Sequence, residues 1–197
     1  MEDLKKLADL LFEGALLKRI QRTGYSYLGT GGESVAAHSF GVALCAWFLG
    51  RYLSLKGKAL DLEKVLKMAV LHDFVEARTG DFNAVNKLYD TADEEKALKD
   101  AFQNTPLEEE VTSLWKEYRK LETLESKVVH DADVLDLIIQ LKEQKDLNNP
   151  YAEKWIDYAM PRLITEEGKA LAQAILERDW CAWWYEFLVE KNSVNEG

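Results

Sequence analysis

The sequence predicts an all-α protein, a single-domain helical bundle that takes in residues 1–197. Apolar residues recur every three or four positions over long stretches, which is the spacing of one helix face. Only three prolines occur, and no segment shows the strict alternation of a half-buried strand. Apolar residues make up 47% of the chain and charged residues 30%, as in ordinary globular domains, and 197 residues suffice for one core.

The expected helices are bounded by residues that favour helix ends. Ser34 and Asp61 carry side-chain oxygens that can cap the helices that follow them, and Thr79-Gly80-Asp81 breaks the second of these helices. The N-terminal helix is expected to bury a face formed by Leu4, Leu7, Leu11 and Ala15. In chain order, we expect helices over residues 2–18, 35–55, 62–78, 83–89, 93–103, 106–120, 123–143, 151–163 and 165–190.

The last of these helices, over about residues 165–190, is rich in aromatic side chains. Its tryptophans Trp180, Trp183 and Trp184 are expected in core or dimer packing rather than as a platform for stacked bases. The two cysteines, Cys45 and Cys181, have no metal-ligand spacing around them, and we interpret both as buried thiols.

Net charge limits the classes of partner. The chain carries −10 at pH 7, so it lacks the basic footprint that binding to duplex nucleic acid requires. A small anion can still bind where a metal ion and a few arginines create a local positive site. No stretch of 18 apolar residues predicts a membrane span, and the N-terminus lacks the apolar segment of a signal peptide. We therefore expect a cytoplasmic protein.

Two of the three histidines lie on apolar helix faces. His38 is followed at four and eleven positions by Val42 and Leu49, and His72 follows apolar residues of the preceding turns. A buried imidazole needs a partner for its nitrogens, which can be a hydrogen bond in the core or a metal ion. Asp73, directly after His72, needs a cation or strong donors if it is buried.

The segment from Val128 to Leu137 places three aspartates in a strongly apolar helix. Asp133 has apolar residues one turn before and one turn after it, so the helical phase points it into the core. Asp131 and Asp136 have polar neighbours one turn away and are expected to be more exposed. His130 is expected to pack in the core or lie at the surface rather than to bind a metal. Asp133 is therefore the carboxylate that needs a buried partner.

Two imidazoles and two carboxylates on the inward faces of three helices can form a site for one divalent metal ion. The set consists of His38, His72, Asp73 and Asp133. Mixed nitrogen and oxygen ligands favour manganese, cobalt, iron, nickel or zinc over magnesium. Such an ion lowers the pKa of water and supplies a nucleophile near neutral pH.

These four residues, in this order, resemble the motif of the HD-domain superfamily of metal-dependent phosphohydrolases, which has a histidine, a His-Asp pair and a later aspartate. The segments Leu17–Tyr25, Glu33–Ser39 and Leu71–Asp81 are similar to its 5′-deoxynucleotidase branch, the last through its His-Asp, Glu and Thr-Gly-Asp elements. Asp131–Leu135 fits the final ligand segment, so the motif region spans residues 19–137. The resemblance implies an all-helical fold and metal ligation by all four residues.

The resemblance also implies roles for residues around the metal. Glu76, four residues after the histidine of the pair, is expected to act in catalysis, and Asp81 of the Thr-Gly-Asp turn to lie near the attacking water or to bind substrate. Arg19 is the best match to the family's phosphate-binding arginine, with Arg22 as its neighbour. Relatives often carry Glu or Asp directly before the first histidine, where this chain has Ala37, and the loss of an acid behind a ligand can alter metal preference.

The implied substrate is a nucleoside 5′-monophosphate, hydrolysed to a nucleoside and phosphate by attack of metal-activated water. Relatives are often homodimers, which the aromatic C-terminal helix allows. Two alternatives stay open. One is HD-type hydrolysis of a triphosphate, a cyclic nucleotide or an alarmone; the other is a non-catalytic, metal-stabilised module that binds a nucleotide or a partner protein. The motif segments contain few basic residues, which favours monophosphates over longer phosphate chains.

Overall fold

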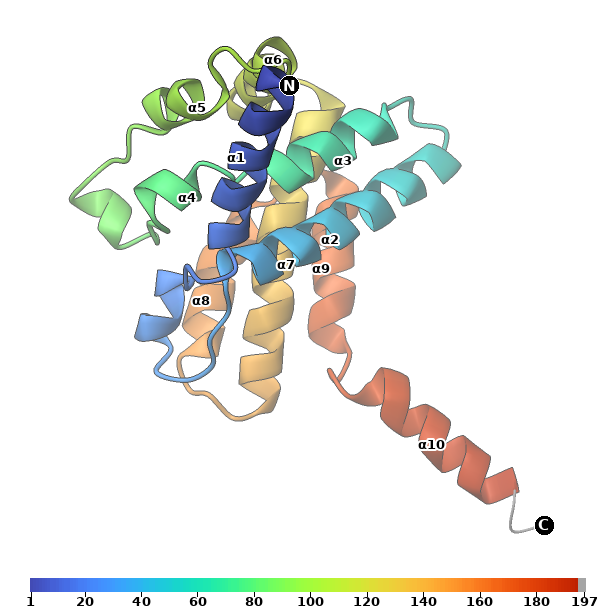
Figure 1. Ribbon diagram of the computed structural model, residues 1–197. Helices are drawn as coiled ribbons and strands as arrows, with labels where there is room; N and C mark the ends of the chain where they lie inside the picture. Colours follow the sequence, from blue (N-terminus) through green and yellow to red (C-terminus); the bar gives the residue numbers. More distant parts are fainter. Residues whose placement is uncertain (195–197) are drawn as a thin grey trace.

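The computed structural model describes residues 1–194 and confirms the all-α class (Figure 1). Within this range the only extended pairing is an isolated bridge between Gln21 and Ser34, and no helix is long and apolar enough to cross a lipid bilayer. The α-helices are α1 (Glu2–Leu16), α2 (Val35–Leu55), α3 (Leu62–Leu71), α4 (Glu76–Thr79), α5 (Glu94–Phe102), α6 (Glu108–Lys120), α7 (Leu124–Asp146), α8 (Ala152–Ala159), α9 (Glu166–Glu177) and α10 (Ala182–Val194). Short 3-10 helices are η1 (Thr23–Tyr27), η2 (Asn86–Leu88) and η3 (Met160–Arg162).

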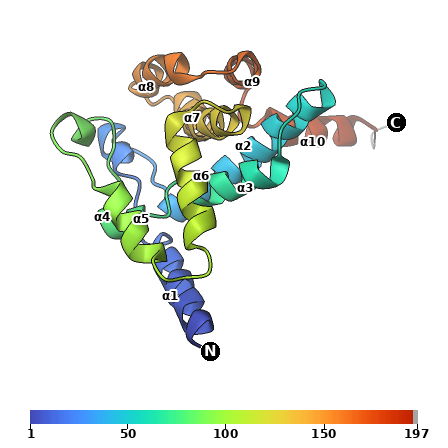
Figure 2. The same cartoon turned by 90° about the horizontal axis from the view of Figure 1, so that it is seen from above.

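The long helix α7 lies at the centre of the bundle. It packs against α2, α3, α6, α8 and α9, and Figure 2 shows α8 and α9 on one side of it and α2 and α3 on the other. Val128, Val129, Leu135 and Ile138 of α7 are fully buried, because helices cover α7 on several sides. Burial of each such side chain stabilises the fold by about 1.5–3 kcal/mol. This packing makes α7 the rigid element on which a site can be built.

Helix starts follow the capping residues that the sequence predicts. Ser34 Oγ accepts a hydrogen bond from the backbone N–H of Ala37 at 3.2 Å, and Asp61 Oδ1 accepts one from Lys64 at 3.1 Å. Each cap satisfies one of the free N–H groups at a helix start and contributes about 1 kcal/mol. The predicted starts of α2 and α3 are therefore confirmed.

The prediction of one helix over residues 62–78 is wrong, because the chain breaks between α3 and α4. The N–H groups of Phe74 and Glu76 donate to carbonyls three residues back, those of Leu71 and Asp73, at 3.1 and 3.0 Å. These tighter turns replace the regular four-residue pattern. The break leaves His72 and Asp73 directly after the end of α3, in the turn that leads to α4.

The single C-terminal helix predicted over about residues 165–190 is also wrong. Arg178 is extended (φ −91°, ψ 142°) and ends α9. The Asp179 carboxylate accepts a hydrogen bond from Cys181 N at 2.9 Å, and Trp180 N donates to Asp146 at 3.0 Å, so the chain turns before α10 begins. Figures 1 and 2 both show α10 projecting away from the body. The three tryptophans of this segment are exposed, with Trp183 at 77%, which contradicts core packing within the chain.

Two smaller predictions also differ from the structure. In α1, Leu4 and Leu11 are 68% and 75% exposed, and the helix instead packs through Leu7 and Leu10 onto the cluster beside α4 and α5. The apolar residues of α1 itself are not confined to one side of the helix, so their spacing alone does not identify the buried face. Cys45 and Cys181 are free and only partly buried rather than fully buried.

Candidate functional site

The four predicted metal ligands meet where α2, the end of α3 and α7 come together. His38 Nε2 lies 3.2 Å from Asp133 Oδ1, 3.6 Å from Asp73 Oδ2 and 3.5 Å from His72 Nε2. His72 Nε2 lies 3.2 Å from Asp73 Oδ2. The ligand atoms of His38, His72 and Asp133 thus all lie within 4.8 Å of one another, and Asp73 adds an oxygen beside both imidazoles.

Both imidazoles are held from behind through the other ring nitrogen. His38 Nδ1 lies 2.7 Å from Asp136 Oδ2, and His72 Nδ1 lies 2.7 Å from the carbonyl oxygen of Ala69. When Nδ1 carries the proton and donates it to these acceptors, each Nε2 keeps a free lone pair toward the cluster. This is the arrangement by which metal-binding histidines are oriented in proteins.

The cluster fits a divalent cation. With metal–ligand distances of about 2.1 Å, neighbouring ligand atoms lie roughly 3–3.4 Å apart, close to the separations of these nitrogens and oxygens. Although burial acts in the opposite direction, hydrogen bonds to Asp133 and Asp136 raise the pKa of His38 to about 10. Burial also opposes ionisation of Asp73 and Asp133, but the imidazoles and Arg22 hold the pKa of both carboxyls well below the usual range. Positive charge is therefore strongly favoured at this point, and a bound cation supplies it.

The three aspartates in the first half of α7 are arranged differently from the prediction by helical phase. Asp133 does face the cluster, but its side chain is 20% exposed to the cavity, whereas Asp131 and Asp136 are 0% and 4% exposed. Asp131 is buried because its carboxylate accepts hydrogen bonds from the N–H groups of Ile164 and Thr165 at 2.7 and 2.8 Å. Other helices cover α7 on several sides, so a polar residue one turn away from an aspartate does not indicate that the aspartate is exposed to solvent.

Asp136 is a residue whose role at the metal ligands the sequence reasoning missed. It lies three residues after Asp133, on the same side of α7, and it holds His38. Gly41 of α2 makes room for it, because a Cβ at that position would lie 1.9 Å from Asp136 Oδ1. A glycine one turn after the first histidine, opposite an aspartate one turn after the last ligand, is the signal that could have identified the pair.

Of the two candidate arginines, the structure places Arg22 in the site. Arg22 Nη1 lies 3.2 Å from Asp73 Oδ2 and 3.3 Å from Asp81 Oδ1. Arg19 is exposed and is not among the residues that line the cavity over the cluster. The tight link between Arg22 and Glu33, whose carbonyl accepts the Arg22 N–H at 2.8 Å, turns this part of the chain toward the metal ligands.

Glu76 begins α4 and lines the same cavity. Its Oε2 is a buried oxygen for which the described residues provide no hydrogen-bond partner. Burial, and then the charges of Asp73 and Asp81, raise the pKa of Glu76 to about 9. A buried carboxyl group with an oxygen left for a ligand is suited to exchange a proton with water or substrate.

Asp81 is occupied by contacts within the chain. Its Oδ2 accepts hydrogen bonds from the N–H and hydroxyl of Thr23, both at 2.6 Å, and its Oδ1 lies beside Arg22. Asn83 Nδ2 donates to the same Thr23 hydroxyl at 2.8 Å. Asp81 therefore holds the segment that carries Arg22 against the metal ligands.

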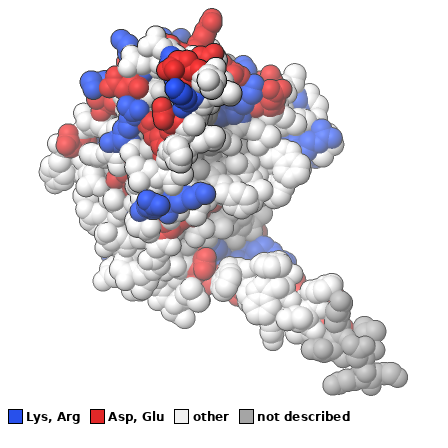
Figure 3. All heavy atoms as spheres, in the orientation of Figure 1, with Lys and Arg blue, Asp and Glu red and all other residues white. Residues whose placement is uncertain are grey.

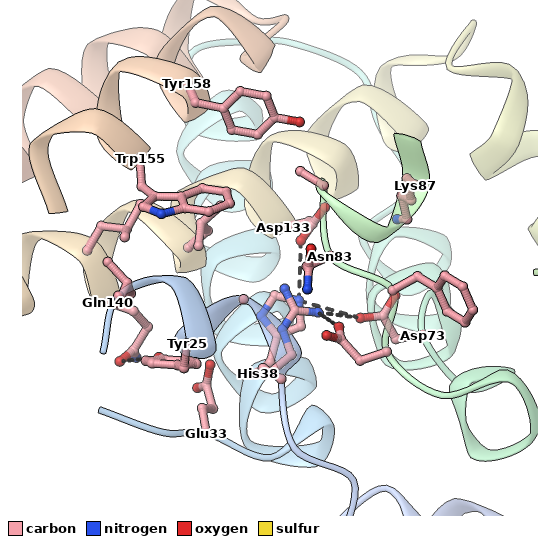
Figure 4. A pocket seen from close by; sticks show the side chains of 18 of the residues that line it. Tyr25, Glu33, His38, Asp73, Asn83, Lys87, Asp133, Gln140, Trp155 and Tyr158 are labelled. Carbon is pink, nitrogen blue, oxygen red and sulfur yellow. Dashed lines mark hydrogen bonds and ion pairs between the residues drawn. The ribbon is translucent and has the colours of Figure 1, made fainter. Parts of the chain in front are cut away.

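Most of these groups, though not His72 and Asp136, line one cavity of about 220 Å³ (Figure 4). His130 does not line it, since its Nε2 lies 3.0 Å from the carbonyl oxygen of Arg162. Ala37 is exposed, so no side chain at that position lies behind His38. The lining residues are Arg22, Gly24, Tyr25, Leu28, Glu33, His38, Asp73, Glu76, Asp81, Phe82, Asn83, Ala84, Lys87, Asp133, Leu137, Gln140, Leu141, Trp155, Tyr158 and Arg162.

Comparison with known proteins finds relatives of similar sequence and fold. The 5′-deoxynucleotidase HDDC2 of Bos taurus is 32% identical over 139 residues, which cover 68% of this chain and 65% of that relative, so the chain spans just under two thirds of its length. A conserved hypothetical protein from Pyrococcus furiosus superimposes with a TM-score of 0.73 at 33% identity, covering 85% of this chain and 98% of that one. A predicted metal-dependent phosphohydrolase from Magnetospirillum magnetotacticum gives 0.67 at 26% identity, covering 88% and 91%.

The match to a family model extends over most of the described structure. The model described as the HD domain aligns with residues 15–174, a range that contains every residue of the cluster together with Arg22 and Glu76. The chain therefore belongs to the HD-domain family.

Proposed function

We propose that the protein is a metal-dependent phosphomonoesterase that hydrolyses nucleoside 5′-monophosphates, with preference for deoxynucleotides. One observation carries this proposal: three of the four residues of the metal-ligand cluster, His38, Asp73 and Asp133, line the same cavity as Arg22 and Glu76. The names of relatives such as the Bos taurus 5′-deoxynucleotidase support the substrate class. A structural metal does not need an arginine and a buried glutamate beside it.

His38, His72, Asp73 and Asp133 would hold one divalent ion of the first transition row rather than magnesium, because two of the four ligands are imidazoles. When bound, the ion supplies Lewis acidity and lowers the pKa of water. The carboxylates and imidazoles fix where that chemistry takes place, and Asp136 fixes the orientation of His38.

Arg22 is the residue that binds the substrate phosphate. A planar guanidinium matches phosphate oxygens in a paired geometry. Burial opposes its charge, but Asp73 and Asp81 raise the pKa of Arg22, so the guanidinium stays protonated. Asp81 acts as a positioning residue, because its carboxylate holds both Thr23 and Arg22.

Glu76 serves the proton transfer. Hydrolysis forms a bond between water oxygen and phosphorus and breaks the bond between phosphorus and the 5′ oxygen of the sugar. One proton must leave the water, and one must reach the departing oxygen. A cation bound beside Glu76 would favour its ionised form. In that form, with a free buried oxygen in the cavity, Glu76 can take the first proton and return it to the leaving group.

The charges that line the cavity favour a short phosphate. Three cationic side chains, Arg22, Lys87 and Arg162, line it with five carboxylates. Arg162 Nη2 also lies 3.6 Å from Asp133 Oδ2. A triphosphate would bring several more negative charges into a cavity with more acids than bases, whereas one phosphate can be matched by the metal and Arg22.

We also propose that the protein is a homodimer in which α10 contacts a second copy of the chain. Trp183, Tyr185 and Leu188 of α10 are each more than half exposed. Figure 3 shows that charged side chains gather over α1, α5 and α6, while the middle of this face, over α2, is largely uncharged. Sedimentation velocity tests this: we expect a dimer for the full chain and a monomer for Trp183→Ser, and a wild-type monomer would contradict the proposal.

The cytoplasmic location stays a prediction.

Phosphate release from a panel of substrates tests the activity. The panel contains deoxy- and ribonucleoside monophosphates, triphosphates and cyclic nucleotides, each with manganese, cobalt, nickel, zinc or magnesium. We expect phosphate from monophosphates, faster for the deoxy series. Pyrophosphate or tripolyphosphate as the main product would overturn the monophosphatase assignment, and no hydrolysis of any phosphomonoester by metal-loaded protein would favour a binding module.

Glu76→Gln separates catalysis from structure. We expect this variant to keep its metal content and its unfolding transition while kcat falls at least about 100-fold. Glu122→Gln, at an exposed position away from the cavity, is the matched control and should keep wild-type activity. Full activity of Glu76→Gln would remove the proposed role.

A further inference from the structure

The cavity extends well beyond the metal ligands, to a wall that the proposed chemistry does not use. Tyr25 of η1, Gln140 of α7, and Trp155 and Tyr158 of α8 line this end. Figure 4 shows them grouped on one side of the cavity, with His38 and Asp73 on the other. When the phosphate of a nucleotide is at the metal, its sugar and base must occupy space of this kind.

The distance along α7 matches a nucleotide. Asp133, Leu137 and Gln140 follow one another at four and three residues, so they lie along one side of the helix, and all three line the cavity. Seven residues at 1.5 Å each separate the metal ligand from the amide by about 10 Å. A nucleoside monophosphate has about this length from phosphorus to the far edge of its base.

Aromatic neighbours fix the orientation of Trp155. Its ring centroid lies 5.8 Å from that of Tyr158 at an interplanar angle of 86°, and 6.3 Å from that of Tyr27 at 55°. Arg162 lies 5.8 Å from the Tyr158 ring centroid and ion-pairs with Asp133, which links this wall to the metal site. A half-buried indole held between two aromatic neighbours, one of them edge-on, is a preorganised face for a flat ligand.

Gln140 adds a polar group to the apolar wall. The Tyr25 hydroxyl lies 3.4 Å from Gln140 Oε1 and donates toward it. Burial, and then the charge of Glu33, raise the pKa of the Tyr25 hydroxyl, so it stays protonated and remains a donor. With its oxygen directed to Tyr25, the amide of Gln140 presents N–H groups, which can pair with a ring nitrogen or carbonyl oxygen of any nucleobase.

We propose that Tyr25, Gln140 and Trp155 form the nucleobase subsite, in which the base stacks on Trp155 and accepts a hydrogen bond from the Gln140 amide. This inference rests on the proposed nucleotide substrate and extends it. Stacking is tolerant of sequence because every base has a flat face, and each base carries an acceptor for the amide. The subsite therefore accepts all four bases and favours purines, whose larger rings stack over more of the indole.

The test compares nucleotides with a substrate that lacks a base. We expect Trp155→Leu to raise KM for deoxyadenosine and thymidine monophosphates about 10- to 100-fold, and Gln140→Leu to raise it about 3- to 10-fold. Both variants should turn over deoxyribose 5-phosphate within twofold of wild type. Trp47→Leu and Gln144→Leu, which replace the same residue types outside this cavity, should leave all the substrates unchanged.

Equal losses for nucleotides and deoxyribose 5-phosphate would mean that Trp155 has only a packing role and would overturn the subsite, as would unchanged KM for nucleotides in both variants.

A calorimetric measurement of ligand binding to metal-loaded Glu76→Gln separates failure of the subsite from failure of the proposed function. We expect it to bind deoxyadenosine monophosphate at least tenfold more tightly than deoxyribose 5-phosphate, with the difference lost when Trp155→Leu is added. Equal dissociation constants for the two ligands overturn the subsite even if the wild-type protein is active. If the two dissociation constants differ as expected but the wild-type protein shows no turnover, the subsite is supported and the activity assignment fails.

Discussion

The carboxylate of Asp136 lies 2.7 Å from His38 Nδ1, on the side of the ring opposite the metal cluster. Both residues are almost fully buried, so the contact is held in a region from which water is excluded. The contact orients the imidazole so that Nε2, with its lone pair, points to the cluster. The pair thereby couples α7 to α2 at the centre of the site.

We predict that Asp136→Asn weakens metal binding about 10- to 100-fold, the usual effect of removing a group behind a metal ligand. The amide can still accept from Nδ1, but it no longer increases the basicity of the ring. Competition titration with a chelating dye measures the affinity, and the unfolding transition of the metal-free protein serves as the control for folding. Unchanged affinity in a folded variant would show that Asp136 does not support His38.

Gly41→Ala is predicted to damage the same pair from the opposite side. The new Cβ would lie 1.9 Å from Asp136 Oδ1, so the carboxylate must move away from His38. We expect reduced metal affinity together with a loss of stability, although alanine normally stabilises a helix relative to glycine by about 1 kcal/mol.

Gly50→Ala in the same helix is the matched control for that substitution. Its Cβ would lie 2.9 Å from the flexible end of Leu62 and at ordinary contact distances, 3.5 and 3.8 Å, from Leu60 and Val128. A small shift of Leu62 can accommodate it, and metal affinity should stay at the wild-type value. Equal metal affinities for the two alanine variants would argue against the steric role of Gly41.

Arg22→Lys is predicted to lower kcat/KM for nucleoside monophosphates about 100-fold, because an ammonium group cannot match the paired geometry of a guanidinium. Arg19→Lys should remain within twofold of wild type, since Arg19 is exposed and outside the cavity. Steady-state phosphate release measures both. The reverse order of effects would restore Arg19 as the phosphate ligand.

Asp131→Asn tests the structural role of the neighbouring buried carboxylate. The substitution replaces an acceptor oxygen with an amide N–H group next to the N–H groups of Ile164 and Thr165. We expect the free energy of unfolding to fall by about 2 kcal/mol, with kcat unchanged below the melting temperature. Asp61→Asn, at an exposed cap, should cost less than about 0.5 kcal/mol. Chemical denaturation gives both values, and a stable Asp131→Asn protein with lost activity would contradict this assignment.

Local rules explain what could be predicted about the fold. The all-α class and the caps at Ser34 and Asp61 depend on spacing and on side chains that bond within three residues, and these are properties of the sequence itself. The tightened turn after α3 was not predictable in this way. The segment from Leu71 to Glu76 contains no glycine or proline that would indicate a break.

The sequence by itself determined the helical class. It also determined which polar residues lie on apolar helix faces and therefore need a partner when buried: His38, His72, Asp73 and one aspartate of α7. Tertiary structure decided which neighbours serve that set. It placed Arg22 rather than Arg19 in the cavity, buried Asp131 and Asp136, and brought Trp155 opposite the metal ligands. The physical reason is that helical phase separates core from solvent only for a helix with one covered face. Around α7, which is covered on several sides, the partner that each carboxylate meets depends on which helix packs there.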